Sequence, residues 1–261
     1  MKAVVVTKTN NPRTEATIKA VQDALKKINI EPIPYEEIEN CDFVIEVGGD
    51  GTILHVAKNA SQYNKAVLGI NSGRVGYMAG LEADELELLS TLKTGDFRLE
   101  KRMLLDVIVN SGETKTNHLA LNEVVVSRGG AARIIDINLS VNDEEPIEYG
   151  ADGIIISTPT GSTAYSLSAG GPVMAPDIEG MILTPICPHS LDSRSVIFSA
   201  DSTLKINGKC RNGGEVFCSV DGEMPIDVTG GSVTVKKSNT TVNLIRIKND
   251  PFYKIFKDKI K

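Results

Sequence analysis

Short apolar, β-branched runs alternate with helical patterns through the first third of the chain. Runs typical of buried parallel strands lie at Ala3–Val6, Phe43–Val47 and Val67–Ile70. Between and after them, apolar and polar positions follow patterns that predict helices over residues 12–29, 52–60 and 83–92, the last closed by Gly95. This strand–loop–helix rhythm indicates a parallel α/β sheet.

The pattern changes near residue 97, and the rest of the chain is mostly strand. The turn pairs Asn207-Gly208, Asp221-Gly222 and Gly230-Gly231 separate short β-rich runs. One helical interruption is expected at Ser162–Ala169, and the tail from Pro251 to Ile260 has a helix-like apolar pattern. The predicted strands cover residues 104–109, 119–127, 133–141, 153–157, 195–199, 203–206, 215–220, 232–236 and 242–247.

The two patterns predict two domains in this chain of 261 residues. The fold class we expect is an α/β N-terminal domain with a Rossmann-like parallel sheet, residues 1–96, followed by a β-rich C-terminal domain, residues 97–247. The C-terminal tail, residues 248–261, is expected to return to the first domain and pack there.

Composition and charge exclude several functional classes. The formal net charge is −6 and aromatic residues make up only 5%, with no Trp, which disfavours binding to nucleic acid or to an anionic membrane. No apolar run approaches the ~18 residues of a membrane helix, and the N-terminus lacks a signal-peptide pattern. The four cysteines form no CxxC pair and the three histidines are widely spread, which argues against a zinc site or a disulfide scaffold. The sequence therefore predicts a cytoplasmic protein.

A glycine-rich loop, Gly48-Gly49-Asp50-Gly51-Thr52, joins a predicted buried strand to a predicted helix. Ligands of open α/β sheets bind beyond the carboxyl ends of the strands, where glycines let the backbone approach phosphate oxygens. An aspartate there suits the acceptance of a proton from an attacking hydroxyl, or contact with the metal that accompanies the phosphates. The alternative is a plain Asp-Gly turn. The chain has no P-loop and no G-x-G-x-x-G, so a nucleotide would be held in another way.

Residues 152–172 form the second candidate segment, with an apolar strand, a run of small hydroxyl residues, a predicted short helix and a closing Gly-Gly-Pro. Its backbone amides and hydroxyls, with the ring of Tyr165, suit a nucleoside. The alternative is a Ser/Thr-rich loop with an N-capped helix.

Asn122 and Glu123 interrupt an apolar run that predicts a strand over 119–127. Two adjacent polar residues in such a run need partners if they are buried, and ribose hydroxyls are suitable ones for a carboxylate. The alternative is a solvent-facing edge.

Together these segments resemble the NAD kinase family. The resemblance is carried, in family order, by residues 48–52, 71–77, 122–123, 152–172 and 184–191, and the flanking regions extend it over essentially the whole chain. Lipid kinases and phosphofructokinases have loops similar to Gly-Gly-Asp-Gly, so that motif alone is weak. The block Thr-Gly-Ser-Thr-Ala-Tyr-Ser-Leu-Ser-Ala-Gly-Gly-Pro, residues 160–172, is specific.

The resemblance implies transfer of the γ-phosphate of ATP to the 2′-hydroxyl of the adenosine ribose of NAD, which gives NADP and ADP. By the family pattern, Asp50 is the proton acceptor. The nucleotide-binding residues implied by the same pattern are Gly51, His55, Asn122, Glu123, Arg133, Asp152, Thr163, Ala164, Tyr165, Ser166, Leu167 and Ser168. His55 stands where family members often have Arg.

The resemblance also implies a divalent cation, Mg²⁺, held mainly by the donor phosphates, and a homodimer or homotetramer. Two other functions are weighed against this one. A lipid or diacylglycerol kinase would share the Gly-Gly-Asp-Gly loop without requiring the 163–168 segment. A non-catalytic dinucleotide-binding protein would keep the pocket, but retention of Asp50 argues against it. The sequence leaves open the phosphate donor (ATP, another triphosphate or polyphosphate) and the choice between NAD and NADH.

Overall fold

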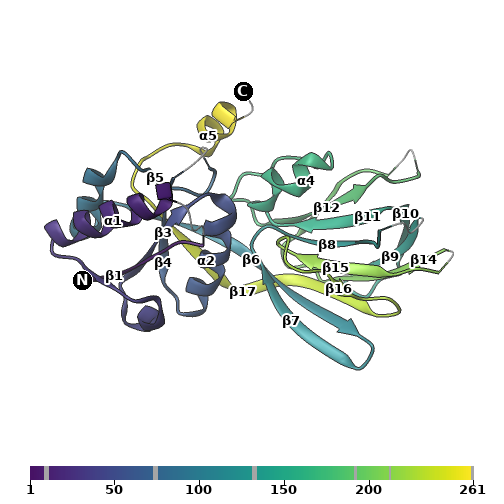
Figure 1. Ribbon diagram of the computed structural model, residues 1–261. Helices are drawn as coiled ribbons and strands as arrows, with labels where there is room; N and C mark the ends of the chain where they lie inside the picture. Colours follow the sequence, from purple (N-terminus) through teal and green to yellow (C-terminus); the bar gives the residue numbers. More distant parts are fainter. Residues whose placement is uncertain (9–11, 73–75, 131–133, 191–192, 212, 260–261) are drawn as a thin grey trace. The chain divides into compact units, whose positions relative to one another are not determined.

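The computed structural model describes residues 1–8, 12–72, 76–130, 134–190, 193–211 and 213–259 (Figure 1). The chain divides into two compact units. Unit 1 comprises Met1–Arg102 and Thr240–Lys261, and unit 2 comprises Met103–Asn239. The chain thus leaves unit 1 after its first hundred residues and returns to it at the end.

Unit 1 is built on a parallel sheet. Its strands lie in the order β2 (Glu31–Ile33), β1 (Lys2–Val6), β3 (Phe43–Gly48) and β4 (Ala66–Asn71), and every pair is parallel. The two-residue strand β5 (Leu81–Glu82) and the end of β17 (Ser232–Arg246) also pair with β4 in parallel. All six residues of β3 are buried, as expected for a strand inside a parallel sheet. The predicted α/β architecture is confirmed.

Helices α1 (Pro12–Lys27) and α2 (Asp50–Gln62) pack against these strands. The predicted helix over 83–92 is wrong in form: a 3₁₀ turn η2 (Leu86–Ser90) leads into a single α turn, α3 (Thr91–Thr94). The hydroxyls of Ser90 and Thr91 donate to carbonyls three residues back, bonds that compete with regular helix formation. Gly95 ends the segment at φ 77°, as predicted. The remaining elements of unit 1 are η1 (Tyr35–Asn40) and α5 (Phe252–Lys259).

Unit 2 consists of two antiparallel sheets that share one apolar core. One contains β10 (Ile147–Ala151), β9 (Ile135–Val141), β14 (Leu204–Cys210) and the start of β17, together with the hairpin of β6 (Arg98–Ser111) and β7 (Thr114–Ala120). The other has the order β13 (Val196–Ser199), β12 (Gly180–Ile186), β11 (Gly153–Ser157), β8 (Glu123–Arg128), β15 (Val216–Val220) and β16 (Ile226–Asp227). The short elements η3 (Gly161–Thr163) and α4 (Tyr165–Ser168) follow β11 in the chain, and α4 is labelled in Figure 1. The β-rich C-terminal domain is confirmed.

Several local predictions for unit 2 need correction. The predicted strand 119–127 is two strands, because the chain breaks at Leu121 and Asn122, where backbone N–H groups turn to the Asp221 carboxylate. Asn207-Gly208 is no turn: both residues lie in β14, where Asn207 pairs with Asn138 of β9. The predicted helix 162–169 is divided between η3 and α4. The pattern did not predict strand β12.

Cys41, Cys210 and Cys218 are buried, and Cys187 is exposed. None of the described helices is both long enough and apolar enough to span a membrane.

Candidate active site

The glycine loop of unit 1 begins where β3 ends. Gly49 caps α2 with extended backbone (φ −107°, ψ 177°), and α2 starts at Asp50. Gly48 is required by packing, because a Cβ there would lie 2.5 Å from Glu46 Oε1 and 3.0 Å from Thr52. A Cβ at Gly49 or Gly51 would meet nothing within 4 Å, and neither residue has a positive φ. The fold itself does not require these two glycines, which leave the start of α2 accessible to a ligand.

Asp50 is held in place by backbone amides. Its Oδ2 accepts the N–H of Tyr77 at 2.8 Å and its Oδ1 accepts the N–H of Met78 at 3.0 Å. A Cβ on Gly76 would overlap the Asp50 carboxylate, so glycine at 76 lets the two segments approach. The carboxylate is therefore oriented by a segment 27 residues away in the sequence.

Glu46 is a buried acid that the sequence reasoning missed. It lies on β3 with no exposed surface, and neither carboxyl oxygen has a hydrogen-bond partner among the described residues. Burial, with the nearby charge of Asp50, raises the pKa of Glu46 to about 8. Its position in an otherwise apolar strand, two residues before the glycines, was the available signal.

His55 lies on α2, five residues after Asp50, and is partly exposed. Its Nε2 is 3.4 Å from Asn59 Nδ2, an i, i+4 contact on the helix.

In unit 2, Asp221 organises the segment that contains Asn122 and Glu123. Its carboxylate accepts three successive backbone N–H groups, from Leu121, Asn122 and Glu123, at 2.8–3.0 Å. Asp221 has φ 50° and Gly222 φ 71°, the left-handed pair of a tight hairpin turn. The Asp221-Gly222 pair was predicted only as a turn, and nothing local in the sequence indicated its long-range role.

Glu123 opens β8 and is buried to 7% exposure, with Oε2 lacking a partner among the described residues. Burial and the charge of Asp221 raise the pKa of Glu123 to about 7, although the backbone N–H of Tyr165 stabilises the ionised form. Ser157, directly opposite on β11, also has an unpartnered buried hydroxyl. A buried carboxyl oxygen and a buried hydroxyl that have no partner among the described residues are suited to bind a polar ligand.

The segment 163–168 has buried and exposed side chains next to each other. Ser166 is fully buried and its hydroxyl lies 2.8 Å from Thr184 Oγ1, while Tyr165 and Leu167 are 45% and 37% exposed. Ser168 is exposed, and Thr163 and Ala164 are partly so. The Tyr165 ring is therefore accessible for stacking, whereas Ser166 supports the segment from within.

Asp152 lies apart from Glu123 within unit 2. The register pairs Gly153 with Ser127 and Ser157 with Glu123, so Asp152 is at the other end of β11, roughly 17 Å away at ~3.4 Å per residue. Asp152 forms a two-pronged ion pair with Arg128, at 2.9 and 3.2 Å, a partner that the sequence reasoning did not name. Arg133 lies outside the described residues.

Comparison with known proteins finds matches to both halves of the chain. The family model for the ATP-NAD kinase N-terminal domain matches residues 3–97, and that for the ATP-NAD kinase C-terminal domain matches residues 121–247. A curated relative named NAD kinase, from Caldanaerobacter subterraneus, is 40% identical over 222 residues, which cover 84% of this chain and 78% of the relative.

The chain belongs to the ATP-NAD kinase family. It is thus an enzyme, a phosphotransferase, and the resemblance seen in the sequence is confirmed.

Two solved structures extend the NAD kinase comparison. An NAD kinase from Archaeoglobus fulgidus in complex with ATP is 30% identical with a TM-score of 0.79, and the match covers 100% of this chain and 97% of that one. Yeast NADH kinase complexed with NADH has a TM-score of 0.88 at 20% identity, over 99% of this chain and 87% of that one, a likeness of fold.

Proposed function

We propose that this NAD kinase family member transfers the γ-phosphate of ATP to the 2′-hydroxyl of the adenosine ribose of NAD. The 2′-oxygen forms the new bond to phosphorus, the bond from phosphorus to the β,γ-bridging oxygen breaks, and ADP leaves. The relatives named NAD kinase and the ATP complex of the Archaeoglobus protein support this assignment.

Asp50 is the proton acceptor in this proposal. The observation that carries it is the carboxylate oriented by the Tyr77 and Met78 amides at the open, glycine-flanked start of α2. A ribose hydroxyl is a poor nucleophile, so a carboxylate held in one orientation contributes by taking the hydroxyl proton as the O–P bond forms.

The NAD-binding residues are proposed mainly in unit 2. Glu123, with its unpartnered oxygen, and Asn122 are suited to accept and donate hydrogen bonds to a ribose and a base, and the Tyr165 ring offers a stacking face. Asp152, Thr163, Ala164, Leu167 and Ser168 are proposed to contact other parts of the dinucleotide, with Ser166 supporting them. In unit 1, Gly51 and His55 are proposed to lie beside the nucleotide.

Mg²⁺ is proposed to enter with ATP. The described residues contain no group of three His, Cys, Asp or Glu side chains that could hold a metal ion, and Asp50 at the start of α2 already accepts two amides. The cation would be held mainly by the donor phosphates, near Asp50 at the open, glycine-flanked start of α2. When bound, the cation neutralises phosphate charge.

The test is NADP formation by the purified protein with ATP, Mg²⁺ and NAD, read with an NADP-specific dehydrogenase. Asp50→Asn should still bind NAD but turn over at least ~100-fold more slowly, the low end of the cost of losing a general base. Asp23→Asn, an aspartate on α1 away from the glycine loop, is the matched control and should keep the full rate. NADH and polyphosphate are assayed in parallel. If no donor yields a phosphorylated dinucleotide, the proposed function is wrong, and a fully active Asp50→Asn refutes only the base assignment.

We also propose a homodimer or homotetramer in the cytoplasm, binding NAD and ATP but neither nucleic acid nor membrane. The family supports the assembly, and the free thiols of Cys41, Cys187 and Cys218 are consistent with a reducing compartment. Mass measurement by light scattering checks the oligomer.

A further inference from the structure

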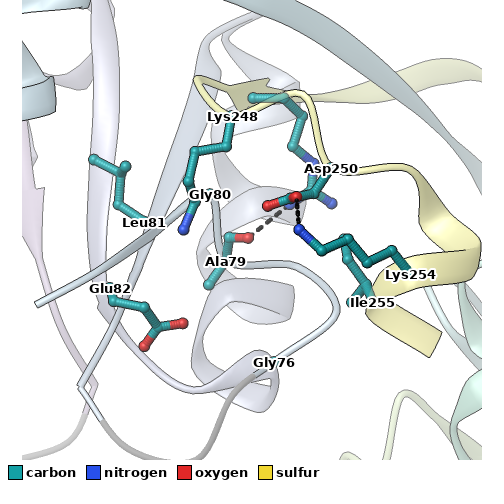
Figure 2. A pocket seen from close by; sticks show the side chains of 10 residues that line it. Gly76, Ala79, Gly80, Leu81, Glu82, Lys248, Asp250, Lys254 and Ile255 are labelled. Atoms are coloured by element: carbon teal, nitrogen blue, oxygen red, sulfur yellow. Dashed lines mark hydrogen bonds and ion pairs between the residues drawn. The ribbon is translucent and has the colours of Figure 1, made fainter. Parts of the chain in front are cut away.

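Arg246, at the end of β17, holds the segment that orients Asp50. The residue is only 6% exposed, and its guanidinium donates to three successive carbonyl oxygens: Tyr77 at 2.9 Å, Met78 at 3.1 Å and Ala79 at 2.7 Å. Figure 2 shows the Ala79 carbonyl with its dashed contact, in the wall of a pocket of about 160 Å³ that Arg246 also lines. Three carbonyls bound by one rigid fork define the path of this segment.

The guanidinium is itself anchored by Glu100. Glu100 Oε1 accepts from Arg246 Nη2 at 3.0 Å and also pairs with Arg102. Burial alone would raise the pKa of Glu100, but the two guanidinium groups overcome it and lower the pKa to about 2. Glu100 is therefore ionised at neutral pH, and Arg246 has a charged partner in addition to the carbonyls.

One peptide unit connects Arg246 to Asp50. The carbonyl of Tyr77 accepts from Arg246, and the N–H of the same peptide bond, that of Met78, donates to Asp50 Oδ1. A trans peptide is planar and its C=O and N–H point in opposite directions, so a group bound at one end orients the other. Hydrogen bonds in such a chain also polarise one another.

The tail supports the same segment from another side. The ring of Tyr77 packs against Phe252 of α5, with centroids 6.5 Å apart, and Phe252 stacks on Phe256 at 6.1 Å. Lys254, on α5, pairs with Asp250 beside the pocket (Figure 2). The segment 76–79 is thus bound by β17 through its carbonyls and by α5 through Tyr77.

We propose that Arg246 is a positioning residue for Asp50, acting through the Tyr77–Met78 peptide on the reaction proposed above. In this role its guanidinium acts on the carboxylate through protein groups, the carbonyls of residues 77–79 and Glu100. Without Arg246 the Asp50 carboxylate is still present, but the segment 76–79 can move. The carboxylate then leaves its reactive orientation. Displacement of about 1 Å at a reacting group costs on the order of 100-fold in rate.

The first experiment compares Arg246→Lys with Lys248→Met. A lysine keeps the charge but cannot bind three carbonyls and Glu100 at once, so kcat should fall ~10- to 100-fold while KM for NAD and ATP stays within ~3-fold. Lys248 lies two residues away, is about one-third exposed and pairs with Glu85, so its replacement should leave kcat unchanged. An unchanged kcat in Arg246→Lys overturns the proposal.

The second experiment is a double-mutant cycle with Asp50→Asn. If Arg246 acts through Asp50, Arg246→Lys should cost less than ~3-fold in the Asp50→Asn background, because the group it positions no longer takes a proton. A merely structural role would lower both backgrounds equally, and that result refutes the proposal.

A measurement on the wild-type protein covers the case in which Arg246→Lys does not fold. The amides of Tyr77 and Met78 should show slow hydrogen exchange, since both donate to a held carboxylate, and exchange at the rate of an open loop contradicts the proposal. Failure of the proposed function is separate: it shows as a wild-type protein that phosphorylates no dinucleotide while these amides are still protected.

Discussion

Each unit buries one glutamate beside an aspartate that holds backbone amides. In unit 1 Asp50 accepts two amides and Glu46 lies behind it, while in unit 2 Asp221 accepts three and Glu123 lies beside it. Among the described residues, Glu46 has no hydrogen-bond partner on either oxygen, whereas Glu123 faces the N–H of Tyr165.

The difference separates two uses of a buried acid. Glu46 lies inside a parallel sheet with no exposed surface, so its ionised form is poorly stabilised. Glu123 lies at the start of a strand, is 7% exposed and faces the backbone N–H of Tyr165. Its carboxyl therefore ionises near neutral pH. The two aspartates also differ in their roles. Asp50 in unit 1 is proposed to take part in the chemistry, whereas Asp221 in unit 2 supports the backbone of residues 121–123.

The largest expected effect is on protein stability, and it comes from Glu46. In the unfolded chain this carboxyl loses its proton above its ordinary pKa of 4.5, and the folded chain keeps the proton to about 8, so stability falls as pH rises between these values. Glu46→Gln should therefore be more stable than wild type at pH 8 by up to about 4 kcal/mol, with the gain absent at pH 4.

Denaturant unfolding at several pH values measures this effect. Glu31→Gln, an exposed glutamate on β2, is the control and should change little at any pH. Equal stability of Glu46→Gln and wild type at pH 8 would show that Glu46 ionises freely.

A second variant weakens the support in unit 2. Asp221→Asn keeps the shape but loses the charge that accepts three amides, and should lower the free energy of unfolding by about 2 kcal/mol. Thermal unfolding measures the loss, with the exposed Asp201 changed to Asn as the control. If Asp221→Asn unfolds like wild type, the three hydrogen bonds do not support the segment.

The smallest expected effect is on KM for NAD, and it comes from Glu123. Its carboxyl ionises as pH rises through about 7, and the ionised form is the better acceptor for ribose hydroxyls, so KM for NAD should fall across that range. Glu123→Gln should raise KM for NAD about 10-fold at pH 8, or ~1.4 kcal/mol, and remove the pH dependence. Initial-rate measurements from about pH 6 to about pH 8.5 decide, and a pH-independent KM in wild type argues against the contact.

Local pattern was enough to predict the strand–glycine–helix of residues 43–60, because burial, turn chemistry and helix formation there agree within a few residues. Local pattern was not enough to predict the strand break at Asn122 and Glu123. The Asp221 carboxylate, 98 residues from Glu123, causes that break. Asn207-Gly208 has the composition of a turn, yet pairing with β9 keeps it extended.

Three of the residues that the sequence reasoning missed share one property. The partners of Arg128, Asp221 and Arg246 are distant in the chain, so the local spacing of residues in the sequence does not predict them. Glu46 is different, because a charged residue in an otherwise apolar strand is visible in the sequence itself.

The division of unit 1 into Met1–Arg102 and Thr240–Lys261 has a consequence for the order of synthesis. The glycine loop leaves the ribosome about 200 residues before Arg246 does. At typical elongation rates the interval is on the order of ten seconds. During that time the nascent sheet lacks β17, and the Tyr77–Met78 peptide has no guanidinium to bind. Under the role proposed for Arg246, Asp50 acquires its orientation only after β17 has been synthesised.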